Sequence, residues 1–113
     1  MEWQRSPQAV VELFERVAPA GPDVTRRKMF GYPAAFVNGN LCCGTFQSQL
    51  MLRLPEAAGA ELAAQGGRPF EPMAGRPMKG YLAIDPADFP DEAAIRAWLE
   101  RAADFTRTLP PKS

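Results

Sequence analysis

The hydrophobic positions of this chain follow a helical period near both ends and a strand period between them. Apolar residues recur at three- and four-residue spacing in two stripes, the first made of Val10, Leu13, Phe14 and Val17 and the second of Ile95, Trp98, Leu99, Ala102 and Phe105. Such stripes are typical of helices that pack one face on a core. We predict a first helix over 7–18, begun by Ser6-Pro7, and a last helix capped by Asp91.

The central part of the chain has the pattern of an antiparallel meander. Asn38-Gly39-Asn40 is a strong hairpin signal, because Asn and Gly tolerate a positive φ. The connections between apolar runs are too short for parallel crossovers. Strands are predicted over 24–30, 34–37, 41–46, 50–54, 68–71 and 78–84, with a second helix over 55–64.

These elements predict a two-layer α+β fold, in which an antiparallel sheet of about five or six strands carries helices on one face. The stripe of the last helix predicts that Trp98 and Phe105 are buried against the sheet. Arg96, Glu100 and Arg107 fall outside the stripe and are expected to stay exposed. We expect a single domain over 1–113, with tails at 1–6 and 109–113.

Charge is balanced over the whole chain but not along it. Thirteen basic and thirteen acidic residues give a net charge of zero, so no global field draws the protein to nucleic acid or membrane. Residues 24–80 nevertheless hold seven basic and three acidic side chains. Six of these cations are candidate anion or nucleic-acid contacts: Arg26, Arg27, Lys28, Arg53, Arg76 and Lys79.

Two interpretations of these cations stay open. Arg26 and Lys28 share one face of their strand while Arg27 shares the other with Met29, so they could contact phosphates or simply form a solvated sheet face. In the segment 75–81, glycines could bring the backbone close to a ligand that Arg76 and Lys79 hold. The same glycines could merely shape a loop.

The two cysteines are adjacent, Cys42-Cys43. Neighbours on an extended strand point to opposite faces, so we expect no disulfide between them, and one thiol in the core with the other on the strand face. A chain without a structural disulfide fits a reducing compartment. The sequence shows no signal peptide and no apolar run of about 20 residues. We expect a cytoplasmic protein.

The residue types argue against the common catalytic sites. The sequence has no histidine, which excludes Ser-His-Asp and Cys-His catalysis and most zinc sites. It also lacks the glycine-rich phosphate loops GxxxxGK[ST] and GxGxxG. Carboxylates around 85–92 lie near a helix start, where they favour the dipole. We therefore expect no catalytic residue, no cofactor and no metal.

Two segments carry a family resemblance. They are Arg27-Lys28-Met29-Phe30-Gly31-Tyr32 and Gly75-Arg76-Pro77-Met78-Lys79-Gly80-Tyr81, with Val37-Asn38-Gly39-Asn40, Leu52-Arg53-Leu54-Pro55 and Arg68-Pro69-Phe70-Glu71-Pro72 in order between them. Ala97-Trp98 and Leu109-Pro110-Pro111-Lys112 follow. From about residue 8 to 112 the chain resembles the N-terminal domain of the TfoX/Sxy competence regulators.

The resemblance implies a two-layer α+β fold similar to that of secretion chaperones. It also implies a role in regulating DNA-uptake genes alongside a transcription activator. The full regulator carries a second, helical domain after this one, so we expect a stand-alone copy of the first. The family supplies no agreed catalytic residues.

Three functional hypotheses follow from the sequence. The first is a non-enzymatic regulatory domain that binds another protein and forms a homodimer, since Phe30, Phe36 and Phe46 supply more aromatic surface than a solvated face needs. The second is direct nucleic-acid binding through the basic central segment. The third, with the least support, is an enzyme with an unfamiliar site.

Overall fold

The computed structural model describes residues 7–73 and 75–112. Ser6, the expected start of the first helix, lies outside these residues. The elements are α1 (Gln8–Val17), β1 (Val24–Met29), β2 (Tyr32–Val37), β3 (Asn40–Phe46), β4 (Gln49–Arg53), α2 (Glu56–Ala63), β5 (Arg68–Pro69), β6 (Tyr81–Ile84), a short 3-10 helix (Pro86–Asp88) and α3 (Glu92–Arg107).

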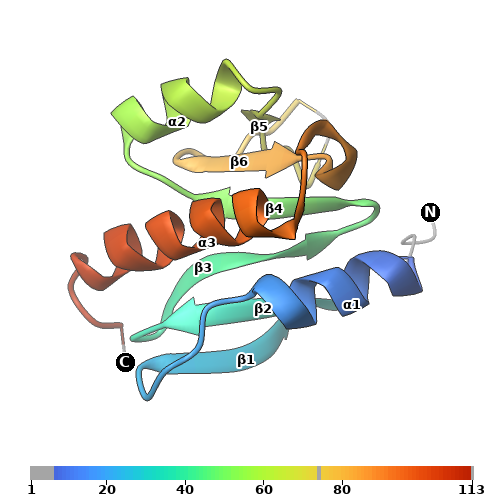
Figure 1. Ribbon diagram of the computed structural model, residues 1–113. Coiled ribbons are helices and arrows are strands. Elements are labelled where there is room, and N and C mark those ends of the chain that lie inside the picture. The colour runs from blue at the N-terminus through green and yellow to red at the C-terminus, as the bar shows by residue number, and fades with distance from the viewer. Residues whose placement is uncertain (1–6, 74, 113) are drawn as a thin grey trace.

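The six strands form one antiparallel sheet in the order β1-β2-β3-β4-β6-β5. β1 and β5 are therefore its edges. Figure 1 shows α1 and α3 lying across one face of this sheet, with α2 beside β5 and β6. The predicted α+β fold, with an antiparallel sheet and helices packed on it, is confirmed.

Two-residue turns join the first three strands. Asn38 and Gly39 have φ values of 50° and 84° between the paired residues Val37 and Asn40, which is the turn type that matches strand twist. The turn between β1 and β2 is similar, but Phe30 occupies its first position with φ of 55°. A bulky side chain is rare in this left-handed conformation, so the turn at Phe30 is backbone-strained.

The main core lies between the sheet and the helices. Its fully buried side chains include Phe14, Val17, Val37, Leu50, Leu52, Leu62, Ile84 and Leu99. The predicted alternation of β4 is confirmed, because Leu50 and Leu52 enter this core. Met51, between them, packs on the opposite face of the sheet.

A smaller cluster covers the other face of the sheet. Its buried members are Tyr32, Ala34, Leu41, Phe46, Met51, Phe70 and Ala83. Phe70 comes from the loop after β5, and its ring meets that of Phe46 edge-on with centroids 5.1 Å apart. This face is thus partly covered by the chain's own loop.

The long helix α3 supplies most of the helical share of the main core. Asp91 caps it as predicted, its Oδ1 accepting from the Ala94 amide at 2.9 Å. Trp98 is buried, with only 6% of its surface exposed. Phe105 is only half-buried, so that part of the prediction is wrong: Thr106 takes the inward position and its hydroxyl donates to the Ala102 carbonyl at 2.7 Å.

Two segments of the structure differ from the sequence prediction. β6 begins at Tyr81 and not at 78, because the Tyr81 amide closes a turn on the Met78 carbonyl and Gly80 has φ of 88°. Residues 109–112, expected as a tail, lie against the β2–β3 turn. There the Lys112 amide donates to the Asn38 carbonyl at 2.8 Å.

The burial of Trp98 gives a prediction for stability. Trp98→Ala leaves a cavity beneath α3 and removes the stacking partner of Arg101, whose guanidinium carbon lies 4.3 Å from the ring centroid. The free energy of unfolding should fall by about 3–5 kcal/mol in a denaturant titration. The exposed Glu100→Ala on the same helix should change it by about 0.5 kcal/mol or less. Equal stabilities for wild type and Trp98→Ala would contradict this packing.

Candidate functional site

The first three candidate cations lie on β1 and alternate across it as predicted. Nη1 of Arg26 donates to Oε1 of Glu15 at 2.9 Å, and its guanidinium lies 5.2 Å from the ring centroid of Phe14, on the helix side. Arg27 stacks over Phe36 at 4.5 Å, on the opposite face. Lys28 is exposed and lines, with both arginines, a shallow hollow of about 220 Å³.

The other three candidates lie far from this group. Arg53 is the last residue of β4, and β2 and β3 lie between β4 and β1. At a spacing of about 4.8 Å between neighbouring strands, β4 is roughly 14 Å from β1. Arg76 and Lys79 are exposed in the loop before β6. The structure thus brings together Arg26, Arg27 and Lys28, and separately Arg53 and Lys79. It does not gather all six on one surface.

A cavity of about 640 Å³ lies where β4 ends and β6 begins, and Arg53 and Lys79 are among the residues that line it. Its walls are formed by α2, the loop that leads into β6, Phe105 of α3, and residues at the ends of β4, β5 and β6. The lining residues are Arg53, Leu54, Pro55, Glu56, Gly59, Ala63, Gly67, Pro69, Pro77, Met78, Lys79, Gly80, Tyr81, Leu82 and Phe105. This cavity is the candidate functional site.

The guanidinium of Arg53 lies against Tyr81, its direct cross-strand partner, on the face of the sheet opposite the helices. Nη1 of Arg53 donates to the Tyr81 hydroxyl at 3.3 Å, and that hydroxyl donates to the Leu41 carbonyl at 2.9 Å. Burial raises the pKa of Tyr81, so the phenol stays neutral and keeps its proton for Leu41. Within the described residues neither Arg53 nor Lys79 forms an ion pair.

Sequence reasoning found Arg53 and Lys79 but missed the walls around them. In the structure Gly59 faces the sheet, where an added Cβ would lie 3.3 Å from Cδ1 of Leu82. Phe105 was expected in the core. The sequence did mark part of this cavity, because segments 52–55 and 75–81, which carry the family resemblance, both contribute residues to its walls.

The cysteines depart from the expected geometry. A bulge lies where Phe36 pairs with Leu41 but Ala35 pairs with Cys43, which leaves Cys42 as an extra residue in β3. Cys42 and Cys43 are both fully buried and belong to the same core cluster. The expectation that one would occupy the strand face is therefore wrong, because strict alternation fails at a bulge. Both thiols are free, and the hydrogen bond that Cys43 donates to Cys42, together with burial, raises the pKa of Cys43.

Comparison with known protein families decides the classification. The family model of the TfoX N-terminal domain matches residues 15–106, which is most of the chain. The chain belongs to the TfoX N-terminal domain family. The resemblance seen in the sequence is confirmed, and segments 27–32 and 75–81 of this TfoX domain lie inside the matched range. The comparison with curated proteins finds no match.

The described part of the TfoX domain shows neither a membrane-spanning helix nor a group of metal-ligating side chains. No helix in it is long and apolar enough to cross a membrane. Nor do three or more Cys, Asp or Glu side chains gather in it as a metal site would require.

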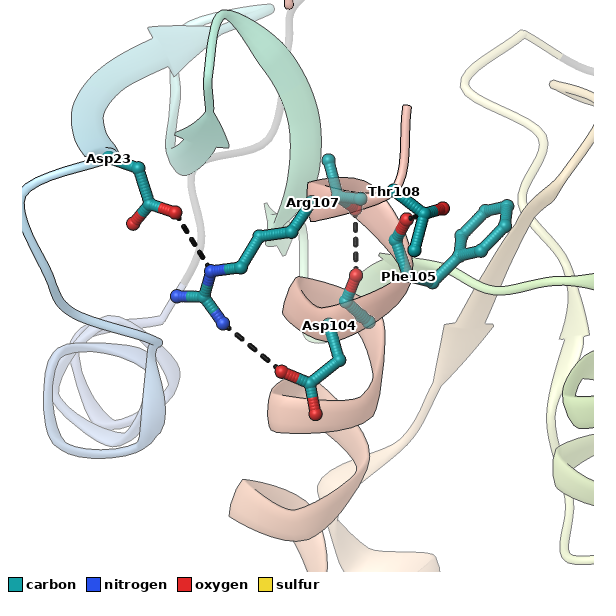
Figure 2. A network of polar contacts seen from close by, with 7 residues as sticks. Asp23, Asp104, Phe105, Arg107 and Thr108 are labelled. Carbon is teal, nitrogen blue, oxygen red and sulfur yellow. Dashed lines mark hydrogen bonds and ion pairs between the residues drawn. The ribbon is translucent and has the colours of Figure 1, made fainter. Parts of the chain in front are cut away.

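A polar network fastens the C-terminal end of α3 to the loop before β1 in this TfoX domain. Figure 2 shows Arg107 between Asp23 and Asp104, with Nε donating to Asp23 at 2.8 Å and Nη1 to Asp104 at 3.1 Å. Arg107, which was expected to stay exposed, is about one third exposed. Its hydrogen bond lowers the pKa of Asp23 and raises its own.

The lowered pKa of Asp23 gives a pH-dependent prediction. A carboxyl whose pKa falls on folding stabilises the protein above its unfolded pKa, near 3.9, and this contribution is lost as pH falls through the folded value. Asp23→Asn should therefore melt below wild type at neutral pH, and the difference in Tm should shrink toward zero below about pH 4. Glu71→Gln, an exposed control without an ion pair among the described residues, should show no such trend. A Tm difference for Asp23→Asn that is independent of pH would contradict the ion pair.

Proposed function

We propose that this chain is a non-enzymatic regulatory domain of the TfoX type that acts by binding another protein. The observation that carries the proposal is the family match over residues 15–106. We further propose that it works in the cytoplasm, in competence regulation, beside a transcription activator. Binding to a partner protein needs an exposed apolar contact rather than a catalytic centre.

Phe30 is the residue that best supports a protein contact. The β1–β2 turn holds it in the left-handed conformation, which disfavours a bulky side chain by about 1–2 kcal/mol. Its ring is 45% exposed, and it touches Phe46 edge-on with centroids 6.4 Å apart. Folding stability alone would favour Asn or Gly here. Strained, exposed aromatic residues are typical of binding sites.

The protein partner could be a second copy of the chain. The exposure of the three phenylalanines limits which of them such a homodimer would use. Phe46 is only 7% exposed, and Arg27 stacks on Phe36. Of the three phenylalanines that favoured a homodimer, Phe30 is thus the most exposed. The homodimer remains a proposal that depends on Phe30.

Replacement of Phe30 tests the proposal directly. Phe30→Asn should keep or raise Tm, because Asn tolerates a positive φ, while it removes the apolar contact. Tagged wild type should retain a specific partner from nuclease-treated extract of the native host, and Phe30→Asn should lose most of it. Exposed Met73, in another loop, provides the control Met73→Gln, which should retain the partner.

Three outcomes would alter or contradict this conclusion. Sedimentation of purified protein at high micromolar concentration identifies the case in which the partner is a second copy. Equal retention by wild type and Phe30→Asn would contradict the proposed contact. A partner that is retained from untreated extract but not from nuclease-treated extract would instead favour nucleic acid as the partner.

Direct nucleic-acid binding is the alternative, favoured by the group Arg26, Arg27 and Lys28 on β1. Arg26 is already paired with Glu15, and the net charge of zero opposes approach. We therefore expect Kd values weaker than about 10 μM for duplex or single-stranded DNA at physiological salt, measured by fluorescence anisotropy. Tight binding that weakens steeply with salt and vanishes in Arg26→Glu/Lys28→Glu would reverse this ranking.

A further inference from the structure

We propose that the cavity beside α2 binds a neutral, largely apolar small molecule. The cavity lies on the helix side of the sheet, between α2 and Phe105 of α3, with Leu54 and Leu82 on its floor. The ligand would contact these side chains and would be held by apolar burial, not by an ion pair. This site goes beyond the proposed regulatory function, since it concerns a small molecule and not the protein partner of Phe30.

The size of the cavity suits such a molecule. Its volume of about 640 Å³ lies within the range of about 300–1,000 Å³ that is typical of small-molecule sites. Gly59 and Ala63 lie one turn apart on the same side of α2, and both line the cavity. This side of the helix therefore carries no bulky side chain that would fill the space between α2 and α3.

The walls of the cavity are mainly hydrocarbon. Leu82 and Phe105 are only partly buried by the protein itself. A ligand that covers them removes further apolar surface from water, and this removal is the source of its affinity. The larger apolar side chains that line the cavity are Leu54, Pro55, Pro69, Pro77, Leu82 and Phe105.

The charged groups at the cavity favour a neutral ligand. Lys79 and Glu56 are both exposed and carry opposite charges, so together they attract neither an anion nor a cation. Glu56 also lies in the first turn of α2, where it offsets the helix dipole. The guanidinium of Arg53 lies against Tyr81 on the other face of the sheet, 5.3 Å from its ring centroid. A charged ligand would lose water in this apolar space without a compensating ion pair, which costs free energy.

Backbone hydrogen bonds hold the rim of the cavity in place. The Leu54 amide donates to the Gly80 carbonyl at 3.1 Å, which joins the loop to the end of β4. The Met78 amide donates to the Phe70 carbonyl at 2.8 Å, which anchors the same loop to the other face of the sheet. The cavity is thus largely formed before a ligand arrives, which lowers the ordering entropy of binding.

N-Phenyl-1-naphthylamine is a suitable probe, because it is neutral and apolar. Its analogue 8-anilinonaphthalene-1-sulfonate has the same rings with one negative charge and is the matched control. Calorimetric titration of the purified protein should show saturable binding of the neutral probe, with amide chemical-shift changes centred on 54–63 and 78–82. The sulfonate should change the same amides only at about tenfold higher concentration. No saturable binding of the neutral probe, or equal affinity of the sulfonate for these amides, would overturn the proposal.

Variants of the two charged residues test the selection for a neutral ligand. Glu56→Gln leaves the charge of Lys79 unbalanced, so it should strengthen the effect of the sulfonate on these amides several-fold. The affinity of the neutral probe should stay within about twofold of wild type in both Glu56→Gln and Lys79→Gln, because no ion pair holds it. A several-fold loss of the neutral probe in Lys79→Gln would mean that the cation selects the ligand and would overturn the proposal.

A variant that fills the cavity localises the probe. Ala63 is exposed on α2 and lines the cavity, so Ala63→Trp should occupy this space without disturbing the core and weaken binding of the neutral probe about tenfold. Ala60→Trp is the matched control, because Ala60 is exposed on the same helix but does not line the cavity. Equal weakening by both variants, or unchanged binding in Ala63→Trp with wild-type Tm, would contradict the assignment.

Two further measurements complete the test. Phe105→Ala removes the wall that α3 supplies and should weaken the neutral probe several-fold, which tests the site even where Ala63→Trp fails to fold. Unchanged binding in Phe105→Ala would place the probe elsewhere and overturn the proposal. The affinity of the probe should also be the same at low and at high micromolar protein concentration. An affinity that falls as the protein concentration rises would mean that a second copy of the chain covers the cavity, which would overturn the proposal.

Discussion

The burial of α3 against β3 and β4 is the interaction on which the other parts of the structure depend. Leu99 of the helix and Leu50 and Leu52 of the sheet are all removed from water in the same core. The other two helices are fixed partly through α3. The pair Arg16–Glu92 joins it to α1 at 2.6 Å, and Arg101–Glu61 joins it to α2 at 2.9 Å. These ion pairs are exposed and contribute little energy, so they orient helices whose stability comes from apolar burial.

The cavity is a consequence of the way α2 is supported. α2 buries only Ala58, Gly59 and Leu62, a small apolar face compared with that of α3. Such a face holds the helix to the sheet at one point and leaves space at its flank. Phe105 lies at the edge of that space because Thr106, next to it, takes the inward position of α3. Weak packing of a small helix thus produces the concave site.

Most of the fold could be predicted from residue pattern alone. The helical stripes predicted α1 and α3, and the strand alternation with Asn38-Gly39 predicted the meander. Tertiary features had no such local signal. The bulge at Cys42 depends on pairing between two strands, and the burial of Met51 depends on a loop that returns with Phe70.

The candidate site likewise has features that the local sequence predicts and features that only the tertiary packing determines. Arg53 and Lys79 could be identified from the sequence, because their charge and the glycines around Lys79 are local properties. Their separation from Arg26 and Lys28 follows from strand order, which puts two strands between β1 and β4. The walls formed by Gly59 and Phe105 depend on how helices sit on the sheet. No residue pattern specifies that placement.

The two edges of the sheet limit how molecules of this protein can associate. On β5, Pro69 has no amide proton to donate to an added strand, and the strand is only two residues long. On β1, antiparallel pairing of two copies would bring Arg26, Arg27 and Lys28 of one chain against the same three cations of the other. Their mutual repulsion disfavours growth of the sheet across molecules. Continuous intermolecular sheets, and the fibrous aggregates built from them, are therefore disfavoured at both ends of this fold.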